Sequence, residues 1–290
     1  MHTSGLVPTS RKTGEKGTQS RFSKGGISSF VRNPARPFNI SRVAIFTPDE
    51  RERLRDELVA VARQDGNLCG AAHTGSAASS QLDRWSDIDL ALCLKTGASY
   101  DQVVAEWTER LYQRHDAVAH VDVMRGATLF RVFLLKNTLQ VDVAFWPAEE
   151  FGAIGPNFCL IFGEAKPARP EPPSNSQALI GMAWLYALHV RSSLARGRVL
   201  QADYMLSGMR NHVFELTCVR CGVIAKQGRG LDDLPASERA AAARCIPGSL
   251  EPSELKSAFR KTMELLVSEI RHVDGQLASK LAGVLQDLVG

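Results

Sequence analysis

The sequence predicts an α+β protein: a core built on a mixed β-sheet, followed by an all-α helical bundle. Three observations lead to this prediction. Residues 43–162 alternate short, β-branched segments with two amphipathic helical segments. Residues 163–176 hold four prolines, which make a stiff, extended connector. Beyond residue 176, apolar residues recur at helical spacing almost to the C-terminus.

The first helix is expected to follow Thr47-Pro48-Asp49-Glu50. Thr47 can cap the helix, Pro48 fits its first position, and Glu50 completes a capping box. Apolar residues then follow at helical spacing, so the helix should end near Gly66. Residues 67–73 read as a short strand that leads to Gly75-Ser76.

A polar loop over 77–86 should separate this strand from a second strand over 87–94. Residues 100–115 form a second amphipathic helix, with valine, tryptophan and leucine on one face. Three strand candidates follow, separated by short turns typical of a meander. They cover residues 120–124, 128–135 and 138–145. Helices on one side of a mixed sheet are therefore expected.

The C-terminal part should form an antiparallel bundle. Ser176 can cap its first helix, a second covers about 202–223, and a break follows at 226–230. Pro252 begins another helix, and Asp274-Gly275 precedes a short last one. The expected organisation is a disordered basic tail over 1–42, a sheet domain over 43–162, a proline-rich linker over 163–176 and a helical domain over 177–290.

The net charge of +4 is unevenly distributed along the chain. Residues 1–42 hold eight Lys or Arg and one Glu, while the rest holds 27 basic and 30 acidic side chains. A basic tail on a mildly acidic body gives no reason to expect a nucleic-acid partner. No apolar run approaches the length of about eighteen residues that a membrane helix needs. The tail has three readings: disorder, an extension upstream of the true start of translation, or an organellar targeting segment.

The six cysteines are scattered, and no secretion signal precedes them, so reduced thiols in the cytoplasm are expected. Cys218 and Cys221 have C-x-x-C spacing, with His212 upstream. A zinc site needs a second ligand pair, and none is visible, so two small side chains packed on one helix face are the preferred reading.

The most informative segment runs from His73 to Leu94. It contains Gly75-Ser76, ten residues, and then Asp87-Ile88-Asp89 inside an apolar run. Residues i and i+2 of a strand point the same way, so Asp87 and Asp89 should project side by side. Two adjacent carboxylates repel each other, so their ionised forms are stable only when a cation lies between them. Mg²⁺ is such a cation, since it prefers oxygen ligands. The Gly-Ser turn offers backbone N–H groups to an anion such as a phosphate.

This arrangement resembles the DNA polymerase β-type nucleotidyltransferase superfamily, whose signature is Gly-Ser followed at this spacing by Asp-x-Asp on a strand. The resemblance covers about residues 46–146 and implies a nucleotidyltransferase core with a third carboxylate on a neighbouring strand. Asp142, in the strand-like run before Phe145-Trp146-Pro147, is preferred for that role. Asp122 is its competitor.

The resemblance implies two Mg²⁺ ions held by Asp87, Asp89 and Asp142, with ATP or another NTP as substrate. Gly75 and Ser76 would hold the β- and γ-phosphates. Asp142 would complete the metal site that lowers the pKa of the acceptor hydroxyl, or act itself as the base. Many relatives have an Arg-Gly pair shortly after Gly-Ser, where this chain has Ser79-Ser80. Arg84, or a residue of the helical domain, would have to replace that basic contact.

The order of core and helical bundle looks like that of the antibiotic-modifying nucleotidyltransferases, such as the aminoglycoside and lincosamide enzymes. The leading prediction is transfer of AMP from ATP to a hydroxyl of a small molecule such as an aminoglycoside-like antibiotic, by a cytoplasmic monomer or homodimer. A protein or RNA acceptor, or a catalytically weak nucleotide-binding module, stays open. Arg210, Glu215, Asp203 and His73 are weaker site candidates, read as surface or packing residues.

Overall fold

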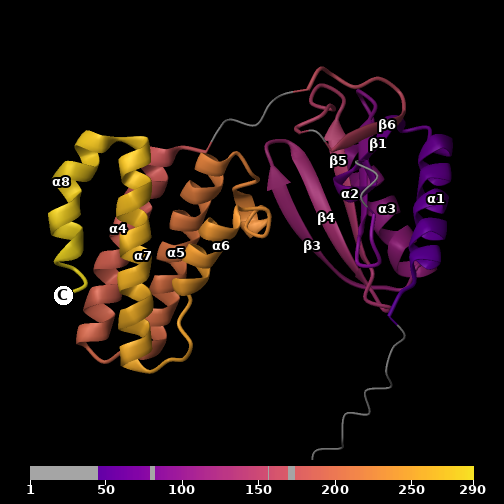
Figure 1. Ribbon diagram of the computed structural model, residues 1–290. Helices are drawn as coiled ribbons and strands as arrows, with labels where there is room; N and C mark the ends of the chain where they lie inside the picture. Colours follow the sequence, from indigo (N-terminus) through magenta and orange to yellow (C-terminus); the bar gives the residue numbers. More distant parts are fainter. Residues whose placement is uncertain (1–44, 79–81, 156, 169–173) are drawn as a thin grey trace, which may run out of the picture.

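The computed structural model describes residues 45–78, 82–155, 157–168 and 174–290. It confirms the α+β class, with a six-stranded sheet in the first half of the chain and helices alone in the second. Figure 1 shows these two halves as separate bodies, each with its own hydrophobic core. The basic tail predicted to be disordered lies outside the described residues.

The sheet has the strand order β3-β4-β5-β2-β1-β6. Only β2 and β5 run parallel, and the other neighbours are antiparallel, so the sheet is mixed as predicted. The predicted meander is present as β3, β4 and β5. The strands are β1 (Leu68–Thr74), β2 (Ile88–Leu94), β3 (Ala117–Arg125), β4 (Thr128–Leu135), β5 (Gln140–Pro147) and β6 (Phe158–Phe162).

Helices α1 (Pro48–Gln64) and α3 (Tyr100–Arg114) cover one face of the sheet (Figure 1). Side chains from both helices and from alternate strand positions form one buried core there, which includes Leu58, Trp107, Leu111, Ile88, Leu90, Val143 and Phe145. The Thr47 and Glu50 capping box at the start of α1 is present as predicted.

The opposite face of the sheet, which we call the open face, carries the intervening residues of each strand. At one end, Ala91, Ala144 and Trp146 pack with Phe151 in a small second cluster. This apolar cluster does not extend to the other end of the open face. Among the described residues, the side chains that the strands present there come from Asp89, Asp142 and their neighbours on β4 and β3.

Two features of the first half differ from the prediction. Strand β6 was not predicted, because it has only five residues and they are half-buried or exposed at the sheet edge, so they show no clear alternation. Strand β2 begins at Ile88, so Asp87 lies one residue before the strand and not inside it. A short helical turn, α2 (Gly75–Ala78), occupies the start of the predicted polar loop.

The helical half consists of long antiparallel helices that bury a common core of leucine, methionine, phenylalanine and alanine. Asn175 caps its first helix, where Ser176 was predicted, because the Asn175 side chain accepts the N–H of Ala178. The short α6 was not predicted, since none of its residues is buried. The elements are α4 (Ser176–Ala195), α5 (Val199–Cys221), the 3₁₀ turn η1 (Lys226–Gly228), α6 (Ala236–Arg244), α7 (Pro252–Val273) and α8 (Gly275–Gln286).

No described helix is both long and apolar enough to cross a membrane. The C-x-x-C pair carries free thiols, with Cys218 buried on α5. No metal-binding group of His, Cys, Asp or Glu includes it among the described residues.

A buried ion pair links three helices of the bundle. Glu269 of α7 is 1% exposed and accepts two hydrogen bonds from Arg220 of α5, at 2.9 Å each. The Thr217 hydroxyl donates to the same carboxylate, and Arg220 also donates to Glu238 of α6. These hydrogen bonds raise the pKa of Arg220 and satisfy the carboxylate that burial has removed from water.

We expect Arg220→Met to lower the free energy of unfolding of the helical half by about 3–5 kcal/mol, because it leaves the Glu269 carboxylate buried without a partner. Arg220→Met/Glu269→Met should recover most of that loss. Lys261→Met is the control, since the Lys261–Glu264 pair is exposed and should contribute less than about 1 kcal/mol. Urea denaturation measures all three, and equal effects of Arg220→Met and Lys261→Met would contradict the expectation.

Candidate active site

The parallel pairing of β2 with β5 brings two of the predicted carboxylates together. In this register Asp89 lies directly opposite Asp142, and both point to the open face. Asp87 joins them from the position just before β2. One carboxylate oxygen from each of the three residues lies within 4.8 Å of the others. The structure therefore gathers the three aspartates that the sequence singled out.

Burial and mutual repulsion make this cluster electrostatically costly. The pKa of Asp89 rises to about 7, chiefly because burial disfavours its charge, and further because of the negative charges of Asp87 and Asp142. Burial likewise raises the pKa of Asp142 to about 6, although a hydrogen bond from Gln140 acts in the opposite direction. The positive charge of Arg229, between α5 and α6, lowers the pKa of Asp89 slightly.

Gln140 belongs to this site and was not predicted. Its side-chain amide donates to Asp142 at 2.9 Å and to Asp87 at 3.2 Å, so it bridges the two carboxylates. The sequence signal was its place two residues before Asp142, which puts both side chains on the same face of the strand. Arg229 was also missed, because nothing in its local sequence points to a site on another part of the chain.

The donor set fits a hard divalent cation. Three close carboxylates supply oxygen ligands alone, which suits Mg²⁺, and two of them have raised pKa values that a bound cation would reverse. Asp87, Asp89 and Asp142 are the residues that would hold it.

Gly75 is fitted closely against this cluster. Its φ of +61° is a left-handed conformation that glycine adopts without strain. A Cβ atom built on Gly75 would overlap the carboxylate of Asp89. The turn that begins α2 thus lies directly against a carboxylate of the cluster, and only glycine allows that approach.

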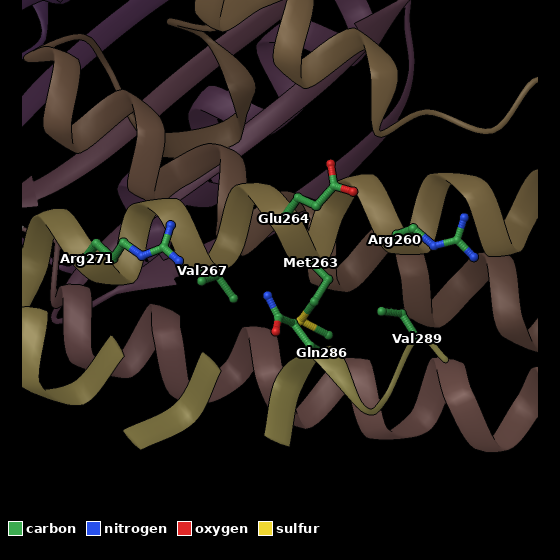
Figure 2. A pocket seen from close by; sticks show the side chains of 7 residues that line it. All are labelled: Arg260, Met263, Glu264, Val267, Arg271, Gln286 and Val289. Carbon is green, nitrogen blue, oxygen red and sulfur yellow. The ribbon is translucent and has the colours of Figure 1, made fainter. Parts of the chain in front are cut away.

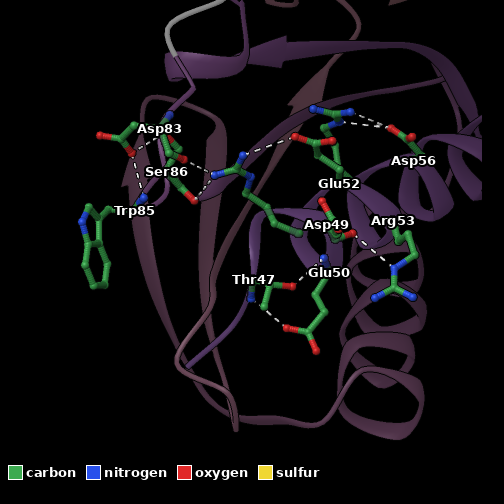
Figure 3. Close-up of polar contacts among 11 residues, drawn as sticks. Thr47, Asp49, Glu50, Glu52, Arg53, Asp56, Asp83, Trp85 and Ser86 are labelled. Carbon is green, nitrogen blue, oxygen red and sulfur yellow. Dashed lines mark hydrogen bonds and ion pairs between the residues drawn. The ribbon is translucent and has the colours of Figure 1, made fainter. Parts of the chain in front are cut away.

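Arg51 of α1 supports the turn that precedes Asp87, and Figure 3 shows Asp83, Trp85 and Ser86 of that turn. Its side chain is 3% exposed, and its guanidinium donates to the backbone carbonyls of Asp83 and Ser86. Arg84, predicted to contact the nucleotide, lies over the ring of exposed Trp85 at 5.1 Å. Its predicted role stays a prediction. Ser79-Ser80 lie outside the described residues.

Asp122, the alternative third carboxylate, lies on the other face of the sheet. It faces Arg131 across the β3–β4 pair and accepts two hydrogen bonds from that guanidinium, both at 2.7 Å. This ion pair lowers the pKa of Asp122. Its neighbour in β3, Val121, is the residue that shares a face with Asp142.

The weaker candidates also fall outside the cluster. His73 neighbours the charges of Arg55 and Asp56 of α1, on the helix-covered face, and burial lowers its pKa. Arg210 donates to Ser207 within α5, and Glu215 accepts a hydrogen bond from Ser174. Asp203 is half-buried on the same helix.

A separate cavity of about 320 Å³ lies between α7 and α8 in the helical half (Figure 2). Arg260, Glu264 and Arg271 stand along α7 above it, and Val267, Met263, Gln286 and Val289 complete the lining. It contains one carboxylate and no metal-binding group, so it is a poor candidate for the predicted chemistry.

No family model matches the chain, and no curated protein matches it in sequence. Among solved structures, the aminoglycoside 6-adenyltransferase from Bacillus subtilis is 13% identical over 82% of this chain and 97% of its own, with a TM-score of 0.37. A nucleotidyltransferase-like protein from Exiguobacterium sibiricum 255-15 is 15% identical over 76% and 74%, with a TM-score of 0.32. Cid1, solved with its short product ApU, is 12% identical over 68% of this chain and 47% of its own, with a TM-score of 0.26.

Two of these structures are named as an adenyltransferase and a nucleotidyltransferase-like protein, the kind of protein that Gly75-Ser76 and the Asp87-Ile88-Asp89 motif predict. Because the TM-scores lie below 0.5, the reaction is inferred below from the carboxylate cluster and its surroundings.

The raised pKa values predict an unusual pH dependence of the metal-free protein. Asp89 binds its proton more tightly when folded, so its contribution to stability is present at low pH and is lost as the pH rises from about 4 to about 7. In EDTA at pH 7.5, Asp89→Asn should therefore raise the free energy of unfolding by on the order of 2 kcal/mol, and by less at pH 5.

Adding Mg²⁺ should raise the melting temperature of the wild-type protein and should have little effect on Asp89→Asn. Denaturant titrations and thermal melts with EDTA or Mg²⁺ measure both effects. If Asp89→Asn were less stable than wild type in EDTA at both pH values, the account of the cluster given above would be wrong.

Gly75→Ala should displace the Asp89 carboxylate, because the new Cβ needs the space that this carboxylate occupies. We expect it to abolish the Mg²⁺-dependent rise in melting temperature. Gly97→Ala, which also changes a glycine of positive φ but has open space around it, is the matched control and should keep that response. An unchanged response in Gly75→Ala would contradict the assigned contact.

Proposed function

We propose that this protein is a Mg²⁺-dependent nucleotidyltransferase that moves a nucleoside monophosphate, AMP from ATP in the first instance, to a hydroxyl of a small molecule such as an aminoglycoside-like antibiotic. The observation that carries the proposal is the cluster of Asp87, Asp89 and Asp142 directly beside the turn at Gly75. Carboxylates grouped in this way suit metal-assisted transfer at phosphorus, which depends mainly on positioning and charge neutralisation.

In the proposed step, the acceptor oxygen forms a bond to the α-phosphorus of the NTP. The bond between that phosphorus and the oxygen bridging to the β-phosphorus breaks, and pyrophosphate leaves with the bonding electron pair. The hydroxyl proton passes to a base, for which Asp142 is our choice because its carboxylate lies in the cluster, directly opposite Asp89. Bound Mg²⁺, two ions in the predicted arrangement, would neutralise phosphate charge and lower the pKa of the acceptor hydroxyl.

The triphosphate is assigned to the turn at Gly75 and Ser76, next to Asp89. Its negative charge also needs cations, and Arg84 was predicted from the sequence to supply one. Arg229 supports this assignment further, since its charge acts on Asp89 from the helical half. Arg229 belongs to the helical half, and a basic residue from that half was one of the two predicted replacements for the Arg-Gly pair that this chain lacks.

The same cluster is compatible with acceptors other than a small molecule. A protein or RNA acceptor would keep the same chemistry, and a weak nucleotide-binding module would lack it. The carboxylate cluster favours an active enzyme over the module. A cytoplasmic location is the one predicted from the scattered cysteines.

An adduct screen tests the reaction. The protein is incubated with Mg²⁺, each NTP and a panel of aminoglycosides and lincosamides, and mass spectrometry then covers both the small molecules and the protein. A nucleotide adduct on an antibiotic that is absent with Asp87→Ala/Asp89→Ala would support the proposal. An adduct on protein alone would favour the protein acceptor, and an absence of NTP binding would refute the proposal.

Asp142→Asn should lower kcat by at least about 10²-fold, because the base and one metal ligand are lost together while the shape is kept. Asp122→Asn is the matched control, as it changes a carboxylate on a nearby strand that points to the other face. It should leave kcat within about twofold. Pyrophosphate release with saturating NTP measures both, and similar losses in the two variants would contradict the role of Asp142.

A further inference from the structure

The strand order fixes the side from which an acceptor reaches the carboxylates. Gly75 follows β1, which lies on one side of β2, and β5, β4 and β3 lie on the other side. In transfer at phosphorus, the attacking and leaving oxygens are roughly in line across the α-phosphate. With the pyrophosphate at Gly75, the acceptor must approach from the side of β5 and β4.

One row of paired residues crosses the sheet along that approach. Asp89 of β2 faces Asp142 of β5, which faces Val132 of β4, which faces Val121 of β3. All four side chains point to the open face. Neighbouring strands lie about 4.8 Å apart, so Val132 and Val121 stand about 5 and 10 Å beyond Asp142.

These two valines and Leu134 form what we call the apolar strip. Val121 is 58% exposed, Leu134 is 48% exposed, and Val132 is half-buried. Together with Ala119 and Gln140 they line a shallow cavity of about 230 Å³. Exposed aliphatic side chains that gather beside a polar site are typical of a surface that binds a ligand.

The apolar strip is continuous with the carboxylate cluster through Gln140. Its side chain lines the cavity and donates hydrogen bonds to Asp142 and Asp87. A molecule whose hydroxyl reaches Asp142 from this side therefore lies over the strip. None of the residues that line the cavity is acidic, so the carboxylates nearest to it are those of the cluster that Gln140 contacts.

We propose that the acceptor carries an apolar face beside its reactive hydroxyl, and that this face binds the apolar strip of Val121, Val132 and Leu134. This inference rests on the proposed function and narrows its acceptor to a hydroxyl compound with an alkyl or aryl group about 5–10 Å from the reacting oxygen.

A pair of glycosides tests the proposal. Methyl β-D-glucoside and hexyl β-D-glucoside present the same ring hydroxyls and differ only in the apolar tail. Both are titrated, below micelle-forming concentrations, into the full chain with Mg²⁺ and an ATP analogue that has a methylene group in place of the oxygen between the α- and β-phosphorus, and calorimetry measures binding. The hexyl compound should bind about tenfold more tightly than the methyl compound.

Val121→Gln should remove this preference. Met124→Gln is the matched control, because Met124 is also 58% exposed on β3 and points to the other face. It should keep the tenfold preference. Both positions are exposed, so neither change should prevent folding.

Three outcomes would overturn the proposal. The first is equal binding, or no binding, of the two glycosides by the wild-type chain. The second is an equal effect of Val121→Gln and Met124→Gln. The third is a wild-type dimer that Val121→Gln dissociates without changing glycoside affinity, since the strip would then be an interface between two copies.

The proposed function fails by a different measurement. If Asp87→Ala/Asp89→Ala retained Mg²⁺-dependent pyrophosphate release, the carboxylate assignment would be wrong whatever the glycosides did. Glycoside binding is read directly and needs no turnover, so the two failures are distinguishable.

Discussion

The parallel contact between β2 and β5 is the interaction on which the candidate site depends. It places the Asp89 and Asp142 side chains opposite each other, next to the apolar cluster of the open face. Their charges repel, and burial removes the water that would screen them, which raises both pKa values. The surrounding sheet core, which is packed on α1 and α3, must hold these groups together against that repulsion.

Three neighbouring residues adapt the fold to this cluster. Gly75 leaves the space that the Asp89 carboxylate occupies, and Gln140 bridges Asp142 and Asp87 through its amide. Arg51, a buried residue of α1, holds the turn from which Asp87 extends. A sheet with a purely structural role does not need these contacts. Residues that are restricted to one type, or that hold charges close together at a cost in stability, are typical of functional sites.

The sequence predicted those parts of the fold that local patterns determine. The capping box at Thr47 and Glu50 set the start of α1, and the i, i+2 spacing of Asp87 and Asp89 set their common direction. Strand β6 and helix α6 bury too little to leave a pattern. Gln140 had a signal in its spacing to Asp142, whereas the charge of Arg229 acts on Asp89 from the other half of the chain, and a single sequence does not show that they lie near each other.

The parallel pair also has a consequence for the order in which the chain folds. Parallel strands cannot be joined by a tight turn, so residues 95–139, with α3, β3 and β4, intervene between the two strands that carry the carboxylates. Contacts so distant in sequence form late, after local helices and hairpins. The carboxylate cluster should therefore form only at the last step of sheet assembly. A local opening of β5 would separate the carboxylates and remove the activity, while most of the native structure persists.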